Sequence, residues 1–194
     1  MSYAIIGSGN VGIALARQFA RSNIEVAIAN SRGASSLAPV VAELKGKTRA
    51  VDLSEALRAD IVILAVPFPA FQNVAQTKTS WSGQIIIDAM NRREKVSGPT
   101  STEVVAGEFS GAKVVRAFNQ LPAAVLASDP LQDGGRRVVF VSSNDADASA
   151  TVAELARHLG FAPIELGRLD EGGRLLDFHR PLVLHNLIEH KFEG

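Results

Sequence analysis

Short runs of apolar residues alternate with amphipathic stretches along most of the chain. Several of the runs are apolar throughout, as expected for parallel strands that helices cover on both faces. The alternation predicts βαβ units and an α/β fold with an open, doubly wound, mostly parallel sheet. The expected strands are Tyr3–Ile6, Glu25–Ala29, Arg49–Val51, Ile61–Val66, Ile85–Asp88, Lys113–Ala117, Arg137–Ser142 and Ala162–Leu166.

Three stretches have the spacing of helices. Apolar residues recur every four positions in 11–20. The stretch 146–159 has Asp145 or Asp147 as a candidate N-cap and Gly160 as a candidate stop. The last stretch, Leu169–Phe192, is also helical in pattern, and Pro181 is expected to divide it into two helices. No linker-like composition separates this tail, so residues 1–194 are expected to form one domain.

A glycine-rich turn, Gly7-Ser8-Gly9-Asn10-Val11-Gly12, follows the first strand and opens the first helix. In the pattern G-x-G-x-x-G, Gly7 permits a tight turn, Gly9 lets the backbone approach a pyrophosphate, and Gly12 lets the helix pack closely on the strand. Unpaired N–H groups at the start of the helix then face the phosphates. The motif predicts dinucleotide binding; the alternative is that the glycines serve a tight turn alone.

The end of the second strand distinguishes NADP from NAD. An NAD site places a carboxylate there for the ribose 2′-hydroxyl, but residues 26–42 contain no Asp or Glu. Instead, Asn30, Ser31 and Arg32 follow the strand, with Ser35 and Ser36 close behind. A guanidinium and hydroxyls suit a 2′-phosphate, so we predict NADP(H) binding. The alternative is a polar surface loop with an exposed arginine.

A third contact zone follows the strand Ile61–Val66. Ligands in such folds lie beyond the carboxyl ends of the strands, so Val66 and Pro67 are expected to flank the nicotinamide ribose or ring. Alternatively, Pro67 merely ends the strand and Pro69 starts the next helix.

These motifs together resemble the NADP reductases that depend on coenzyme F420, an 8-hydroxy-5-deazaflavin. The cytoplasmic oxidoreductase domain of membrane metalloreductases is similar too, and it uses a flavin. The resemblance covers essentially the whole chain and is carried by Gly7–Gly12, Asn30–Arg32, Ala65–Pro67, Ala117–Ala124, Gly173–Leu176 and Pro181–Leu184.

The resemblance implies a small Rossmann-type domain with extra C-terminal strands and helices, in which residues 143–194 complete the cleft for a second cofactor. It implies hydride transfer between NADP(H) and a deazaflavin or flavin (FMN or FAD), with no general acid or base required. The residues implied to bind NADP(H) are Ser8, Gly9, Asn10 and Val11 on the first turn, Ser31 and Arg32 at the 2′-phosphate, and Ala123 near the nicotinamide.

One position departs from the family pattern. Where the deazaflavin enzymes have a histidine in the segment 117–123, this chain has Asn119. That position is expected to face the second ring, so the acceptor stays open between deazaflavin, flavin and a different molecule. The alternative is that Asn119 is a turn residue after a strand.

Composition excludes several other functions. The 20 basic and 20 acidic residues balance, which argues against a nucleic-acid-binding protein. The chain has no cysteine, so a disulfide scaffold, a thiolate nucleophile and a Cys-ligated zinc are excluded. On a helix, His185 and His190 would lie about 140° apart, so we expect no metal site there. The first basic residue is Arg17 and no apolar run is long enough to span a bilayer, so a cytoplasmic protein without membrane contact is expected.

Polar residues outside these motifs receive simpler interpretations. Arg92-Arg93 and Arg136-Arg137 are expected to be solvated loop charges, although the first pair could attract an anionic tail of the second cofactor. Asp88, at the end of a strand, is interpreted as a turn residue rather than a catalytic acid.

Two further hypotheses and one question of assembly stay open. A non-catalytic NADPH-binding redox sensor would use the same glycine turn. A reductase of a small carbonyl or imine usually adds a large helical domain, for which the residues after Ser142 are expected to be too few. The apolar C-terminal residues, expected on helices, would complete the core or form a homodimer contact; they are Leu182, Leu184, Leu187 and Ile188.

Overall fold

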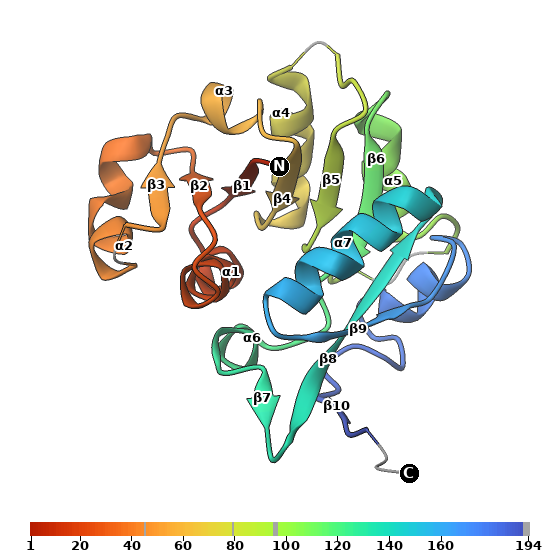
Figure 1. The fold of residues 1–194 in the computed structure, drawn as a ribbon. Helices are drawn as coiled ribbons and strands as arrows, with labels where there is room; N and C mark the ends of the chain where they lie inside the picture. Colours follow the sequence, from red (N-terminus) through yellow and green to blue (C-terminus); the bar gives the residue numbers. More distant parts are fainter. Residues whose placement is uncertain (45, 79, 95–96, 192–194) are drawn as a thin grey trace.

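The structure is a computed structural model that describes residues 1–44, 46–78, 80–94 and 97–191. One sheet gathers strands from both ends of the chain, and helices pack on its two faces (Figure 1). The strands are β1 (Tyr3–Ile6), β2 (Val26–Ala29), β3 (Thr48–Ala50), β4 (Ile61–Leu64), β5 (Ile85–Asp88), β6 (Lys113–Ala117), β7 (Leu131–Gln132), β8 (Gly135–Ser143), β9 (Ala162–Glu165) and β10 (Ile188–Glu189).

The strand order is that of a Rossmann-type sheet. Six parallel strands run in the order β3-β2-β1-β4-β5-β6, and the long strand β8 then adds antiparallel to β6. Strands β7, β9 and β10 all pair with β8. The chain reverses its direction of travel across the sheet at β1, and the neighbouring ends of β1 and β4 form the switch point where ligands bind in such sheets. The expected fold class is therefore confirmed.

Helices cover the sheet in two groups. The longer ones are α1 (Asn10–Arg21), α5 (Ser101–Glu108) and α7 (Ala146–His158), and the shorter ones are α2 (Ala38–Glu43), α3 (Leu53–Ala56), α4 (Phe71–Gln76) and α6 (Ala123–Ala127). Residues of α1, α6 and α7 pack in one apolar core, and residues of α3, α4 and α5 pack in the other. Within the described part of the chain, no helix combines the length and the apolar character needed to cross a membrane.

Alternating side chains of the buried strands supply both cores. Ile5 contributes to the core under α1, whereas its neighbours Ala4 and Ile6 contribute to the core under α4. The same alternation holds in β4, where Ile63 and Leu64 belong to opposite cores and neither is exposed. The continuous apolar runs of the sequence thus follow from burial on both faces.

The C-terminal segment differs from the sequence prediction. Instead of two helices divided by Pro181, the described part of 169–192 holds one 3-10 turn, Gly172–Leu176, followed by turns and the short strand β10. Phe192, the end of the expected helix, lies outside the described residues. Two adjacent glycines lower the helical propensity. In addition, His179 (φ 69°) and Leu184 (φ 66°) adopt a left-handed backbone that a helix cannot contain.

A buried arginine anchors this segment. Arg137 is 2% exposed, so the expectation of a solvated loop charge was wrong for this residue. Its Nε donates to Asn186 Oδ1 (2.9 Å), and its Nη1 donates to the backbone oxygen of Asp129 (2.7 Å). Burial lowers the pKa of Arg137 from its ordinary value. Arg136, its neighbour on β8, is exposed, because successive side chains of a strand face opposite sides.

The N-cap of α7 gives a first prediction. Asp145 accepts a hydrogen bond from the Ala148 backbone (2.8 Å) and pairs with Lys113 (3.0 Å). Asp145→Ala is expected to lower the free energy of unfolding by about 1 kcal/mol in urea denaturation. Asp145→Asn keeps the cap and is the control. An alanine variant as stable as the wild type at pH 7 would contradict the assignment.

The pH dependence of this effect follows from the same contacts. The hydrogen bond from Ala148, and then the one from Lys113, hold the pKa of Asp145 below its ordinary value of 3.8. A carboxyl group whose pKa is lower in the native state than in the unfolded state stabilises the fold at pH values above its unfolded-state pKa. This stabilisation is lost as the pH falls through the native-state pKa. The difference in the free energy of unfolding between Asp145→Ala and wild type should therefore become smaller as the pH is lowered.

Candidate functional site

The turn between β1 and α1 depends on two glycines for its shape. Gly7 has φ 115°, and a Cβ atom there would lie 2.3 Å from the Ala65 carbonyl oxygen. A Cβ on Gly12 would lie 1.9 Å from the Gly7 carbonyl oxygen, because α1 packs directly on the turn. By contrast, a Cβ on Gly9 would have no neighbour within 4 Å. Gly7 and Gly12 are thus required by the fold, whereas Gly9 faces open space.

The first turn of α1 is free to bind an anion. Gly9 is the N-cap, no side chain caps the helix, and the first turn contains no acidic residue. Since the first N–H groups of any helix lack intrahelical partners, those of α1 face the open space beside Gly9. The turn therefore fits the pyrophosphate of a dinucleotide on grounds of both space and charge.

Polar side chains at the end of β2 join the glycine turn. Asn30 Nδ2 donates to the hydroxyls of Ser8 and Ser36 (3.0 Å each), and Asn30 Oδ1 accepts from the Arg32 backbone N–H (2.8 Å). Arg32 Nη2 lies 3.2 Å from Ser8 Oγ. Ser31 and Arg32 are exposed to solvent. This network directs the Arg32 guanidinium back toward the turn, where it can meet a phosphate.

A hollow of about 590 Å³ brings most of the predicted site together. We call it the first hollow. Among its described lining residues, Arg32 is the one charged side chain, so the hollow offers positive charge and no carboxylate. Its lining consists of Ile6, Gly7, Ser8, Gly9, Asn30, Ser31, Arg32, Leu53, Ala65, Val66, Pro67, Ala70, Asn73, Val74 and Thr77.

A second hollow, of about 410 Å³, continues from the first. The two share the segment Ala65–Pro67, which follows β4. The second hollow also reaches the first turn of α1 at Val11 and the end of β5 at Ala89. It is lined by Val11, Ala65, Val66, Pro67, Phe68, Pro69, Ala89, Met90, Asn91, Arg93 and Glu94. Together the hollows follow the carboxyl edge of the sheet.

Two predicted residues lie elsewhere. Asn10 and Ala123 line a separate hollow of about 300 Å³ between α1 and α6, together with Ile13 and Arg17. Ala123 therefore does not line either the first or the second hollow. Gly12 is a buried residue of α1, and Ser36 accepts a hydrogen bond from Asn30.

A buried ion pair lies beneath the second hollow. The register of the sheet sets Asp88 of β5 opposite Arg116 of β6, and both side chains are fully buried. Arg116 Nη1 donates to Asp88 Oδ2 (2.7 Å) and to the Met90 carbonyl (2.8 Å). Thr102 Oγ1 also donates to Asp88 Oδ2 (2.7 Å). Asp88 Oδ1 also accepts a hydrogen bond from the Met90 backbone N–H (3.0 Å), so Asp88 is a turn residue as expected, whereas its buried ion pair with Arg116 was not predicted.

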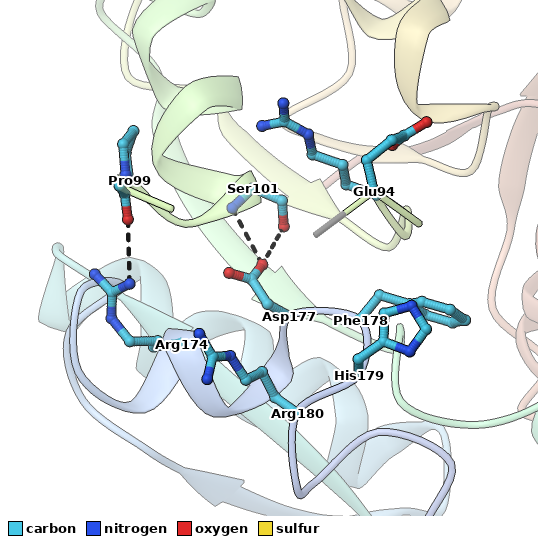
Figure 2. Close-up of a pocket in the computed structure, with 10 residues that line it drawn as sticks. Glu94, Pro99, Ser101, Arg174, Asp177, Phe178, His179 and Arg180 are labelled. Atoms are coloured by element: carbon cyan, nitrogen blue, oxygen red, sulfur yellow. Dashed lines mark hydrogen bonds between the residues drawn. The ribbon is translucent and has the colours of Figure 1, made fainter. Parts of the chain in front are cut away.

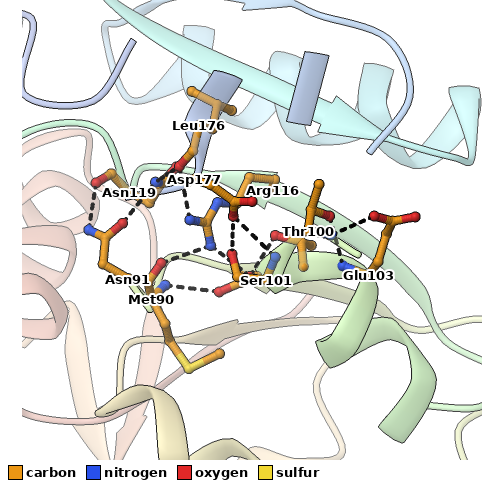
Figure 3. A network of polar contacts seen from close by, with 11 residues as sticks. Met90, Asn91, Thr100, Ser101, Glu103, Arg116, Asn119, Leu176 and Asp177 are labelled. Atoms are coloured by element: carbon orange, nitrogen blue, oxygen red, sulfur yellow. Dashed lines mark hydrogen bonds and ion pairs between the residues drawn. The ribbon is translucent and has the colours of Figure 1, made fainter. Parts of the chain in front are cut away.

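Asn119 joins the same network (Figure 3). Its Nδ2 donates to the Leu176 carbonyl (2.8 Å) and to Asn91 Oδ1 (3.1 Å), while Asn91 Nδ2 donates to the Asn119 carbonyl (2.9 Å). Asn119 is 3% exposed, and its Oδ1 has no hydrogen-bond partner among the described residues. Asn119 thus fixes Asn91, which lines the second hollow.

One wall of the site was not predicted from the sequence. Asn73, Val74 and Thr77 of the α4 region line the first hollow, and Asn91 lines the second. The sequence contained one signal for the helical wall, because Asn73 and Thr77 are four residues apart and therefore share a helix face. No sequence pattern indicated Asn91, since its position depends on the contact with Asn119.

The described residues contain no cluster of three or more His, Asp or Glu side chains arranged to hold a metal ion. His185 lies outside the helices and strands of the described chain and His190 follows β10, so the helical geometry assumed for the two was wrong.

Comparisons with known proteins agree with this geometry. A sequence model of the family described as NADP oxidoreductase, coenzyme F420-dependent, matches residues 2–92. A crystal structure of a hypothetical protein from Sinorhizobium meliloti is 46% identical, with a TM-score of 0.95 over 98% of this chain and 96% of that one. A crystal structure of a putative F420-dependent NADP-reductase from Arthrobacter sp. FB24 is 26% identical, with a TM-score of 0.75 over 91% of this chain and 90% of that one.

Longer proteins are similar as well. Metalloreductase STEAP3 of Rattus norvegicus is 29% identical over 85% of this chain and 33% of its own length. The chain spans about a third of the length of the curated relatives it matches. Fold, site and similarities together define a Rossmann-fold protein of the NADP-dependent oxidoreductase class. The chain is similar to coenzyme F420-dependent NADP oxidoreductases, whose family model matches its residues 2–92.

Proposed function

We propose that this protein transfers a hydride between NADP(H) and a flavin or deazaflavin. The observation that carries the proposal is the pair of joined hollows at the carboxyl edge of the sheet, one with Arg32 and the glycine turn and the other apolar at Val66, Pro67 and Phe68. The nicotinamide and the acceptor ring supply the redox chemistry when bound. The protein binds, orients and shields them from water.

We propose the following roles for the first hollow. The N–H groups of Gly9, Asn10 and Val11 bind the pyrophosphate, and Ser31 and Arg32 bind the 2′-phosphate. Ser8, Asn30 and Ser36 hold Arg32 in place through the hydrogen bonds described above. Val66 and Pro67, at the junction of the hollows, flank the nicotinamide. The expected place of Ala123 beside the nicotinamide finds no support in its position between α1 and α6.

Residues 143–194 are proposed to complete the cleft that binds the second cofactor. The Leu176 carbonyl accepts hydrogen bonds from Arg116 and Asn119, which ties the C-terminal segment to the edge of the sheet. Asn119 is proposed to act by positioning Asn91 at the second hollow. Leu184 and Leu187 are 63% and 43% exposed, and we propose that they form a homodimer contact. Light scattering after size exclusion measures the molar mass in solution and so distinguishes a monomer from a dimer.

Arg32 provides a direct test of the coenzyme preference. Arg32→Ala is expected to weaken NADPH binding by about 10–100-fold, because a charge-assisted hydrogen bond to the 2′-phosphate is lost. NADH binding should change little, since NADH lacks that phosphate. Titration calorimetry measures both affinities, and Arg58→Ala, another exposed arginine, is the matched control. An equal loss for the two coenzymes would rule out this role for Arg32.

The acceptor is tested by stopped-flow oxidation of NADPH with F420, FMN and FAD. We expect single-turnover hydride transfer to at least one of the three. Tight NADPH binding without oxidation by any of them would favour a redox sensor and overturn the proposed reaction.

A further inference from the structure

A third hollow, of about 350 Å³, lies between the segment before α5 and the C-terminal segment (Figure 2). We call it the arginine hollow, because three of its lining residues are arginines that come from both segments. Its lining consists of Arg92, Glu94, Gly98, Pro99, Ser101, Arg174, Asp177, Phe178, His179 and Arg180.

The arginines differ in how they are held. Arg174 Nη1 donates to the Gly98 carbonyl (3.1 Å) and its Nε to the Asp170 carbonyl (3.2 Å), so this side chain bridges the two segments. The guanidinium of Arg180 is exposed and forms no hydrogen bond or ion pair with another described residue. Arg92 lies over the Phe68 ring, 5.5 Å from its centre. Arg180 is therefore the group best placed to receive an anion.

The two carboxylates of the arginine hollow, Asp177 and Glu94, neutralise its positive charge only in part. Asp177 Oδ1 accepts from the backbone N–H (3.1 Å) and the hydroxyl of Ser101 (2.5 Å), so its charge is directed at the start of α5. The cap of α5 is also complete, because Thr100 and Glu103 exchange side-chain hydrogen bonds with each other's backbone. With the helix N-terminus already satisfied, an incoming anion would bind the arginine side chains. The three arginines outnumber Asp177 and Glu94.

The arginine hollow adjoins the second hollow. Both are lined by Glu94, and Arg92 of one contacts Phe68 of the other. His179 Nε2, in the C-terminal segment, lies 3.3 Å from the Arg93 carbonyl oxygen in the segment before α5, so this contact joins the two segments that line the arginine hollow. A molecule with its ring in the second hollow can therefore extend a flexible tail toward Arg180.

We infer that the arginine hollow binds the phosphate group of the electron acceptor, and that the protein thereby favours phosphate-bearing acceptors over those without phosphate. Arg180 and Arg174 supply the charge, and a guanidinium presents its N–H groups in a geometry that matches phosphate oxygens. The inference rests on the proposed function, because it assigns a substrate class to the same cleft.

FMN and riboflavin test the inference, since they share one ring system and riboflavin lacks the phosphate. With NADPH as donor, kcat/KM for FMN should exceed that for riboflavin by about tenfold, as expected for one charge-assisted contact near the surface. In Arg180→Gln this ratio should fall toward one. The control is Arg136→Gln, an exposed arginine on β8, which should keep the wild-type ratio. A wild-type ratio near one, or a ratio that Arg180→Gln leaves unchanged, would overturn the inference.

Equilibrium binding separates this inference from the proposed function. If no flavin or deazaflavin oxidises NADPH, the proposed function fails, and fluorescence quenching of FMN and riboflavin by the NADP⁺-loaded protein then decides the inference. Tighter binding of FMN, lost in Arg180→Gln and weakened by added inorganic phosphate, supports it. Equal binding of the two flavins, or no binding of either, overturns it.

Discussion

Arg116→Met is expected to lower the free energy of unfolding by about 3–5 kcal/mol, because it leaves the Asp88 carboxylate buried without its cation. Both side chains of the pair are fully buried, and Arg116 also donates to the carbonyls of Met90 and Leu176. The variant therefore loses an ion pair and the tie between the sheet and the C-terminal segment. Urea unfolding followed by circular dichroism measures the change.

A double variant separates the buried charge from the packing. Asp88→Asn combined with Arg116→Met removes both charges, so it should be more stable than Arg116→Met alone. Arg93→Met, at an exposed position, controls for the substitution itself and should leave the stability within about 0.5 kcal/mol of wild type. The expected loss is about 3–5 kcal/mol. An Arg116→Met protein whose free energy of unfolding lies within about 1 kcal/mol of wild type would therefore refute the structural role of the ion pair.

Gly12→Ala and Gly9→Ala are expected to have different effects, the first on both stability and binding and the second on binding alone. The alanine Cβ at position 12 would lie 1.9 Å from the Gly7 carbonyl oxygen, a backbone atom that cannot move without distorting the turn. We expect a loss of about 2–3 kcal/mol of stability, together with loss of NADPH binding. At position 9 a methyl group meets nothing within 4 Å, so the fold should be unaffected.

The Gly9 variant is the informative one for binding. Its methyl group would occupy the space that we assign to the pyrophosphate, so NADPH affinity should fall by about 100-fold while the unfolding free energy stays within about 0.5 kcal/mol of wild type. Thermal unfolding and calorimetric titration of the same samples give both quantities. Wild-type NADPH affinity in Gly9→Ala would show that the phosphates bind elsewhere.

The parallel part of the fold could be predicted from the sequence because it depends on local patterns. Continuous apolar runs such as Ile61–Val66 occur where a strand is buried on both faces, and the structure places strands at all eight expected positions. The glycine turn could be located because Gly7 and Gly12 satisfy steric demands within a few residues of each other. Asp145 was one of two expected N-caps, and it is the one that caps α7.

The remaining features depend on contacts between distant residues. Arg137 was expected to be solvent-exposed, but it is buried and donates to Asn186. No sequence pattern indicated that Asp88 would pair with Arg116. The C-terminal segment has helical spacing, yet it folds against β8 with left-handed residues that no periodicity reveals. The lining role of Asn91 follows from its hydrogen bonds with Asn119, 28 residues away.

The most direct test of the account is a titration of the wild-type protein with NADPH and NADH under identical conditions. The first hollow, with Arg32 and without a carboxylate in its lining, predicts that NADPH binds at least about tenfold more tightly than NADH. Binding of both coenzymes with equal affinity, or of neither, would contradict the central claim that the glycine turn and Arg32 form an NADP(H) site.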